Sequence, residues 1–204
     1  MSTIIGLTGP TGSGKTTVSA FMERHGIHSI NCDEVAHQVI SPGKPAFQEL
    51  VGAFGSGILG ADGGICRHKL ADFAFATSDA TQKLNSITHP QILKAIQDRI
   101  DELRATGVRG ILLDAPTLYE SGADALCDRV IAILAAPDER HKRVVCRDGI
   151  AEDAVCLRMG AQQPDSFYTE RADDIIYNNG DLDSLKMRLT EMFHEYIRIF
   201  QWKI

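Results

Sequence analysis

The chain has 204 residues, which suits one domain built around a single sizeable core. Its formal net charge of −6 argues against a nucleic-acid partner, because such proteins usually carry a basic surface. The longest apolar run, 130–136, is far shorter than the roughly 20 residues that cross a bilayer. Five dispersed cysteines without a C-x-x-C pair fit reduced thiols. We expect a cytoplasmic monomer with no membrane partner.

The first expected strand, Thr3–Leu7, runs into a phosphate-binding loop. Residues 9–16 read Gly-Pro-Thr-Gly-Ser-Gly-Lys-Thr, a full match to G-x-x-x-x-G-K-[ST]. Val18, Phe21 and Met22 then follow at helical spacing, so the strand–loop–helix context of the motif is present. The loop's N–H groups and the helix N-terminus both favour a bound phosphate. The alternative is a glycine-rich turn before an ordinary helix.

The loop predicts an ATP site in which Lys15 reaches the β- and γ-phosphates. The Thr16 hydroxyl is the expected protein ligand of a Mg²⁺ cofactor. The loop residues expected to bind ATP are Pro10, Thr11, Gly12, Ser13, Gly14, Lys15, Thr16 and Thr17.

The second expected strand, His28–Asn31, leads directly to Asp33. A carboxylate at the carboxyl edge of a sheet can accept the proton of an attacking hydroxyl. It would lie beside the phosphate loop if the second strand is close to the first. Asp33 could instead cap a helix through Val35 and Ile40, and the sequence leaves both interpretations open.

Residues 35–104 are predicted to form a mostly helical insertion. They contain no convincing strand, a turn at 41–45 and a glycine-rich break at 55–64. His89-Pro90 reads as the end of one helix and the start of the next, since proline suits a first helical turn. Arg67 and Lys69 read as an ordinary exposed pair.

The third expected strand, Gly110–Asp114, ends on a carboxylate that could join a Mg²⁺ site, although aspartate also favours turns. The fourth is Arg129–Leu134. Residues 139–172 are polar and basic and are predicted to form a mobile lid. Arg140, Arg143 and Arg147 share one helical face there. They could bind phosphates, or they could form a solvated basic face.

The fifth expected strand, Asp174–Tyr177, precedes an amphipathic C-terminal helix. Strands that alternate with helices predict an α/β fold, a P-loop NTPase-type three-layer fold with a five-stranded parallel sheet. A helical substrate-binding insertion and a lid complete it. The predicted core comprises 1–34, 105–138 and 173–204, with the acceptor-binding insertion at about 35–104 and the lid at about 139–172.

Taken in order, these segments resemble the dephospho-CoA kinase family nearly end to end. Beyond the P-loop, Gly64 to Leu70 is similar to its G-x-x-R-x-x-L segment, and Leu84 to Pro90 to its L-x-x-I-x-H-P stretch. Asp114 to Glu120 resembles its D-x-P-L-L-F-E signature. Arg143 and Arg147 match its lid arginines, and Gln162 matches a later glutamine. The departures are Asn31, Cys66, Thr117, Tyr119 and Arg140.

The resemblance implies ATP-dependent phosphorylation of the ribose 3′-hydroxyl of dephospho-CoA, the last step of coenzyme A synthesis. It implies catalytic roles for Lys15, Asp33 and Arg143, and ATP contacts from Arg143, Arg147 and Asn178. The acceptor would be bound by Asp33, Arg67, His89, Pro90, Asp114 and Leu118. A Mg²⁺ ion would be bound by Thr16, with Asp114 as a further candidate.

Two other functions remain open. A P-loop kinase for a nucleotide or sugar-acid acceptor needs the same loop, base and lid. A nucleotide-dependent switch or motor ATPase is the other alternative, although the N-K-x-D guanine motif is absent from the sequence and Ala115 replaces the second acid often found after the third strand.

Overall fold

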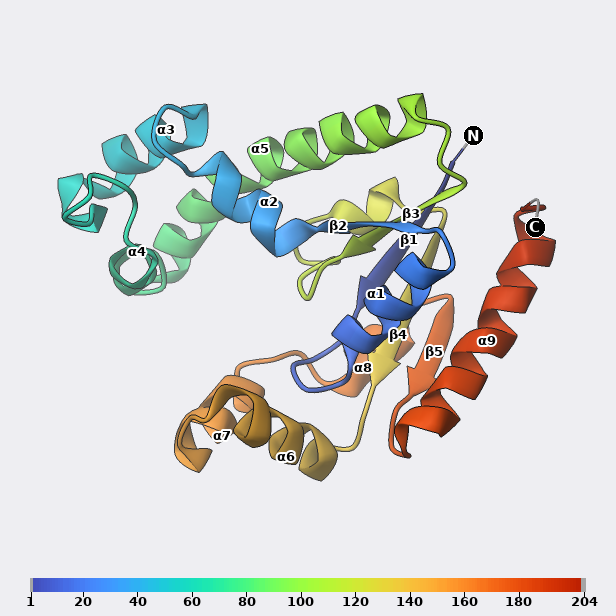
Figure 1. Ribbon diagram of the computed structural model, residues 1–204. Helices are drawn as coiled ribbons and strands as arrows, with labels where there is room; N and C mark the ends of the chain where they lie inside the picture. The colour runs from blue at the N-terminus through green and yellow to red at the C-terminus, as the bar shows by residue number, and fades with distance from the viewer. Residues whose placement is uncertain (1, 203–204) are drawn as a thin grey trace. The chain divides into compact units, whose positions relative to one another are not determined.

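The computed structural model describes residues 2–202 and divides into two compact units. The first comprises 1–30 and 103–204, and the second comprises 31–102. The first unit is built on a five-stranded sheet (Figure 1). Its strands are β1 (Thr3–Thr8), β2 (His28–Asn31, which leads into the second unit), β3 (Gly110–Asp114), β4 (Arg129–Leu134) and β5 (Asp174–Tyr177). The five-stranded parallel sheet predicted from the sequence is confirmed.

The strand order is β2-β3-β1-β4-β5, so the phosphate-loop strand is central. β1 pairs in parallel with both β3 and β4, and Leu7 is in register with Asp114 and Ile131. The sheet therefore places β3, not β2, beside β1. The carboxylate that ends the strand next to the phosphate loop is Asp114.

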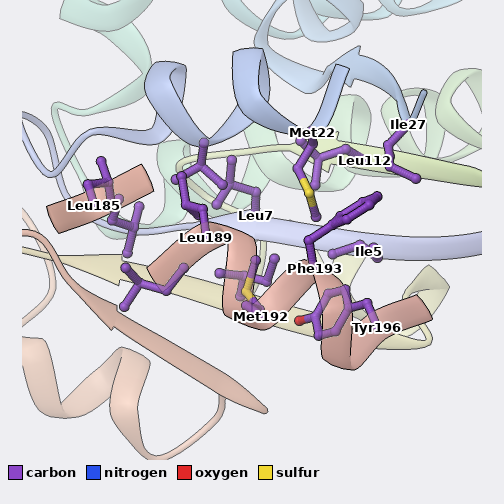
Figure 2. Close-up of a cluster of buried hydrophobic side chains, with 14 of the residues drawn as sticks. Ile5, Leu7, Met22, Ile27, Leu112, Leu185, Leu189, Met192, Phe193 and Tyr196 are labelled. Carbon is purple, nitrogen blue, oxygen red and sulfur yellow. The ribbon is translucent and has the colours of Figure 1, made fainter. Parts of the chain in front are cut away.

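One face of the sheet packs against α1 (Lys15–Arg24) and α9 (Leu182–Ile199). Figure 2 shows the core that they share, in which Ile5 and Leu7 of β1 lie among Met22, Leu189 and Phe193. These side chains are at most 4% exposed. Their burial favours folding by about 25 cal/mol for each Å² of apolar surface removed from water. It also fixes α1, and with it the loop before α1, on the sheet.

The opposite face carries α8 (Asp165–Thr169) and the loop after β3, which includes η2 (Ala123–Leu126). Tyr168 packs there with Ala132 and Leu134 of β4, and Tyr119 packs edge-on against Phe167. Tyr119 thus makes the aromatic contact that a phenylalanine would make. The predicted lid also contains α6 (Pro137–Asp148) and α7 (Glu152–Gly160), which pack against each other.

The second unit is helical and has its own core. Its elements are α2 (Cys32–Val39), α3 (Pro45–Phe54), η1 (Ser56–Ile58), α4 (Arg67–Ala74) and α5 (Ser78–Ala105), the last of which ends in the first unit. Ala46, Leu50, Ile58, Leu70 and Ile87 are buried together in it.

The reading of His89-Pro90 as a break between two helices is wrong. α5 is a single helix of 28 residues with Pro90 inside it. Proline removes one backbone hydrogen bond and costs about 3 kcal/mol in a helix interior. Ile87 before it and Ile96 and Ile100 after it are all buried, so packing on both sides stabilises the continuous helix.

Within residues 2–202, no helix is both long and apolar enough to cross a membrane. All five cysteines lie in this part of the chain, and none of them is in a disulfide bond.

A hydrogen-bonded cluster joins β4, β5 and α9. Arg129 donates through Nε to Asp174 Oδ2 at 2.6 Å and through Nη2 to Oδ1 at 2.9 Å, and the Tyr196 hydroxyl also donates to Asp174. Burial alone would raise the pKa of the Asp174 carboxyl, but the hydrogen bonds from Arg129 and Tyr196 outweigh it and lower the pKa below the ordinary 3.8.

We expect Asp174→Asn to lower the free energy of unfolding by about 1.5–3 kcal/mol, the range for hydrogen bonds to charged groups. Because the folded-state pKa is lowered, the stabilisation is complete above the ordinary pKa and is lost as the pH falls through the folded-state value. Urea unfolding of both proteins at pH 7 and pH 3 measures this. Asp183→Asn, which removes an exposed partner of Lys186, is the control. A wild-type–variant difference that does not change with pH would contradict the assignment.

Candidate active site

The phosphate loop begins where β1 ends and closes at the first turn of α1. Gly9, Gly12 and Gly14 adopt positive φ angles of 140°, 75° and 112°. The backbone N–H groups of Gly12, Gly14 and Thr16 donate to no acceptor in the described part of the chain. Such N–H groups at a helix N-terminus form a binding site for an anion. The loop therefore has the geometry that its sequence predicts.

Lys15 and Thr16 start α1. The Lys15 ammonium donates to the carbonyl of Gly9 at 2.7 Å and lies 3.4 Å from that of Pro10, so it is folded back over the loop. In phosphate loops, a lysine ammonium in this position contacts the phosphate oxygens of a bound nucleotide. Thr16 is exposed.

Three residues from distant parts of the chain hold the loop. The Asn178 amide donates to the carbonyl of Ser13 at 2.8 Å. Arg143 of α6 donates to the backbone carbonyl of Asn178 at 2.9 Å and to that of Gly12 at 3.4 Å. The side-chain oxygen of Gln162 accepts from the Thr11 N–H at 3.0 Å. The structure thus brings Lys15, Arg143 and Asn178 together, and it adds Gln162.

Asp114 is held against the loop's helix. Ser19 of α1 donates its hydroxyl to Asp114 Oδ2 at 2.6 Å. This contact orients a carboxylate beside the strand that carries the loop. Hydroxyl and carboxylate oxygens are the ligands that Mg²⁺ prefers, so Thr16 and Asp114 suit that ion. Across residues 2–202, no group of three or more His, Cys, Asp or Glu side chains is arranged so that it could bind a metal ion.

The three arginines of α6 have different surroundings. Arg143 contacts the phosphate loop, as described above. Arg140 is 9% exposed and lies 3.9 Å from the Asp165 carboxylate, so it does not belong to a solvated face. Arg147 is directed to Asp148. Its predicted contact with ATP stays a prediction.

The remaining acceptor-side candidates lie mainly in the second unit. Asp33 is exposed in the first turn of α2, and the cap of this helix is Asn31, whose side chain accepts from the Glu34 N–H at 3.1 Å. The alternative in which Asp33 caps the helix is therefore wrong. Arg67 is exposed at the start of α4. Their roles in binding an acceptor stay predictions.

His89 and Pro90 lie on α5, where burial lowers the pKa of the His89 imidazole. Leu118 belongs to the first unit and is fully buried, and a Cβ added at Gly6 would lie 2.6 Å from its side chain. Its predicted acceptor contact is not tested by this packing.

Sequence reasoning missed Ser19 as a site residue and did not place Gln162 in the site. Ser19 left one signal, because it is a polar residue on the side of α1 that carries buried Val18 and Met22. Gln162 lies 151 residues from its partner Thr11, and only the family pattern marked it.

The first glycine of the loop provides a steric test. A Cβ added at Gly9 would lie 2.1 Å from the backbone carbonyl oxygen of Ile133, and its φ of 140° is unfavourable for any other residue. We expect Gly9→Ala to displace the loop and to abolish measurable ATP binding. Gly43→Ala is the control, because Gly43 has a φ of 85° but open space around it. It should lose only about 1–2 kcal/mol of stability. Titration with an ATP analogue, together with thermal unfolding, measures both effects. Equal effects of the two substitutions would contradict the steric argument.

A central parallel strand that runs into a glycine loop with Lys15, covered by an arginine-bearing helical segment, defines a P-loop nucleotide-binding protein of the kinase type. A family model described as dephospho-CoA kinase matches residues 3–184. The chain belongs to the dephospho-CoA kinase family.

Individual relatives agree with this assignment. The chain is 39% identical to the dephospho-CoA kinase of Corynebacterium efficiens over 193 residues, which cover 95% of this chain and 96% of that protein. It is 36% identical to the dephospho-CoA kinase of Carboxydothermus hydrogenoformans over 200 residues, covering 98% and 95%. The crystal structure of TT1252 from Thermus thermophilus superposes with a TM-score of 0.81 at 27% identity, covering 95% of this chain and 97% of that one.

Proposed function

We infer that this protein transfers the γ-phosphoryl group of ATP to dephospho-CoA and so forms coenzyme A. The observation that carries this inference is the match of the dephospho-CoA kinase family over residues 3–184. The phosphate loop and the residues around it support the ATP half of the reaction. The identity of the acceptor hydroxyl, the ribose 3′-hydroxyl, rests on the family resemblance.

The first unit supplies the groups that bind ATP. The N–H groups of the loop surround the β-phosphate, and the Lys15 ammonium exchanges the carbonyl of Gly9 for phosphate oxygens. Arg143 lies at the loop through its contacts with Gly12 and Asn178, and offsets charge that develops on the transferring group. A bound Mg²⁺ ion, with Thr16 and Asp114 as its protein ligands, would supply further charge neutralisation.

The second unit supplies the acceptor side in this proposal. Asp33 accepts the proton of the attacking hydroxyl, and Arg67, His89 and Pro90 bind the acceptor. Exposure of Asp33 and its freedom from the capping role are compatible with this assignment. Residues 139–172 act as a lid that excludes water and so limits ATP hydrolysis. We further propose that the protein acts as a monomer in the cytoplasm.

A coupled ADP-release assay with Mg·ATP tests the function. Dephospho-CoA, AMP and gluconate are supplied in parallel, and mass spectrometry identifies the product. ADP release that depends on dephospho-CoA, with a product heavier by one phosphate, is the expected result. Activity with AMP or gluconate, but not with dephospho-CoA, would favour a kinase for another acceptor. Rapid hydrolysis without any acceptor would favour an ATPase.

A further inference from the structure

Two arginines of the lid share one carboxylate at the C-terminal end of α6. Arg147 donates through Nε to Asp148 Oδ1 at 2.6 Å and through Nη2 to Oδ2 at 3.0 Å. Arg158 of α7 donates through Nη1 to the same Oδ2 at 2.8 Å. A single carboxylate therefore joins guanidinium groups from two helices.

The position of Asp148 is unfavourable for a carboxylate. It is the last residue of α6, where the helix macrodipole is negative and favours cations. The hydrogen bond from Arg147 is the main cause that lowers the pKa of the Asp148 carboxyl, and the charges of Arg147 and Arg158 contribute. The carboxylate is thus stabilised by the two arginines and not by its place in the helix.

The hydrogen bonds leave part of each guanidinium available. A guanidinium carries five N–H donors in a rigid planar fork. In the described structure Arg147 uses Nε and Nη2 but not Nη1, while Arg158 uses only Nη1. The Asp148 side chain is 22% exposed, whereas those of Arg147 and Arg158 are 56% and 51% exposed. The Asp148 side chain is therefore less exposed than either of the two arginine side chains that it joins.

Arg147 lies one helical turn after the arginine of α6 that contacts the phosphate loop. Arg143 contacts the carbonyl of Gly12, and Arg147 follows it by four residues on the same helical face, about 5–6 Å further along. A polyphosphate that starts at the loop can extend over this distance. Guanidinium groups bind phosphates through two parallel hydrogen bonds when their planes are held in place.

We propose that Asp148 is a positioning residue. It holds Arg147 and Arg158 in the orientation in which their unused donors bind the polyphosphate of ATP. The inference rests on the ATP half of the proposed function. Asp148 itself does not contact the nucleotide. It acts by removing the rotational freedom of two long side chains before ATP arrives, so that less conformational entropy is lost on binding.

If only charge mattered, Asp148→Asn would change the affinity for ATP in the direction opposite to that expected from a positioning role. Asp148→Asn removes a negative charge near a site for an anion, and Coulomb repulsion would then fall and strengthen ATP binding. If Asp148 positions the arginines, the same change weakens ATP binding. The direction of the change therefore separates a positioning role from a neutralising one.

The experiment measures the binding of a non-hydrolysable ATP analogue by calorimetry, without acceptor. We expect Asp148→Asn to weaken binding about five- to tenfold, the scale of coupling between members of one hydrogen-bond network. Asp148→Glu, which retains the charge, should recover at least half of the loss on a logarithmic scale. Glu139→Gln is the matched control, since Glu139 lies on α6 and its ion pair among residues 2–202 is with Lys142, at 3.1 Å. It should leave the affinity unchanged.

A mutant cycle tests whether Asp148 changes the affinity for ATP through Arg147 and Arg158. In a protein that carries Arg147→Ala and Arg158→Ala, Asp148→Asn should cause no further loss of affinity. Equal weakening in this background and in the wild type would overturn the proposal, as would unchanged or stronger binding by Asp148→Asn. Thermal unfolding of each variant identifies any that does not fold. If Asp148→Asn does not fold, Asp148→Ser, which also removes the carboxylate, takes its place in the cycle with the same criterion.

The test separates this inference from the proposed function. Binding of the ATP analogue does not depend on the acceptor. If Asp148→Asn weakens binding of the ATP analogue as expected but the wild type does not phosphorylate dephospho-CoA, the proposed function is wrong and the inference stands. If coenzyme A forms and Asp148→Asn binds ATP normally, the inference fails and the function stands.

Discussion

Lys15→Ala is expected to lower kcat by about 10²–10³-fold, the cost of removing one preorganised group that stabilises transition-state charge. Lys15 sits at the N-terminus of α1, and its ammonium lies 2.7 Å from the carbonyl of Gly9, at the mouth of the loop. The same substitution should weaken ATP binding by about 10- to 100-fold, because a hydrogen bond to a charged group contributes about 1.5–3 kcal/mol. Steady-state kinetics and calorimetry with an ATP analogue give the two values.

The control is Lys186→Ala, which removes an exposed lysine of α9 whose partner is Asp183. It should leave both values near wild type. Thermal unfolding checks that Lys15→Ala keeps its fold, since the loss of its contacts with the carbonyls of Gly9 and Pro10 also affects the loop itself. A folded Lys15→Ala protein with normal ATP affinity and turnover would rule out the phosphate-loop assignment.

The local part of the fold could be predicted because it depends on short patterns. Four of the five strands have their predicted ranges, and β1 extends one residue further than predicted, to Thr8. Runs such as 130–134 are almost wholly apolar because both faces of a parallel sheet are covered. The helical spacing of Val18 and Met22 likewise predicted their burial in α1. In these segments the nearest neighbours in sequence determine the structure.

The contacts that assemble the site could not be predicted from short sequence patterns. Asn178 and Ser13 are 165 residues apart, and Ser19 and Asp114 are 95 apart. Such pairs follow from strand order, and the sequence does not show that β3 lies between β2 and β1. Helical spacing put three arginines on one face of α6, but it could not show that Arg140 is buried or that Arg147 turns to Asp148.

Pro90 illustrates a different limit. Local preference predicted a helix boundary there, yet α5 continues through it. Ile87 is buried in the core of the second unit, so the energy that keeps the helix continuous comes from tertiary packing. Helix propensity alone underestimates the stability of a helix when both of its halves are packed against other parts of the protein.

Asp33→Asn is expected to lower kcat by about 10²–10⁴-fold, the usual contribution of a general base. ATP affinity should stay near wild type, because the residues proposed to bind the phosphates belong to the loop and the predicted lid. Rates with saturating dephospho-CoA, and calorimetry with an ATP analogue, separate the two effects.

Glu34→Gln is a close control, since Asp33 and Glu34 are adjacent exposed carboxylates in the first turn of α2. Each substitution removes a similar favourable interaction with the helix macrodipole, about 0.3–1 kcal/mol. The two variants should therefore lose similar stability, and only Asp33→Asn should lose turnover. If both retain full activity, the proton of the acceptor hydroxyl leaves through another group. If both lose activity equally, the acidic first turn of α2 matters for its structure, and Asp33 is not the base.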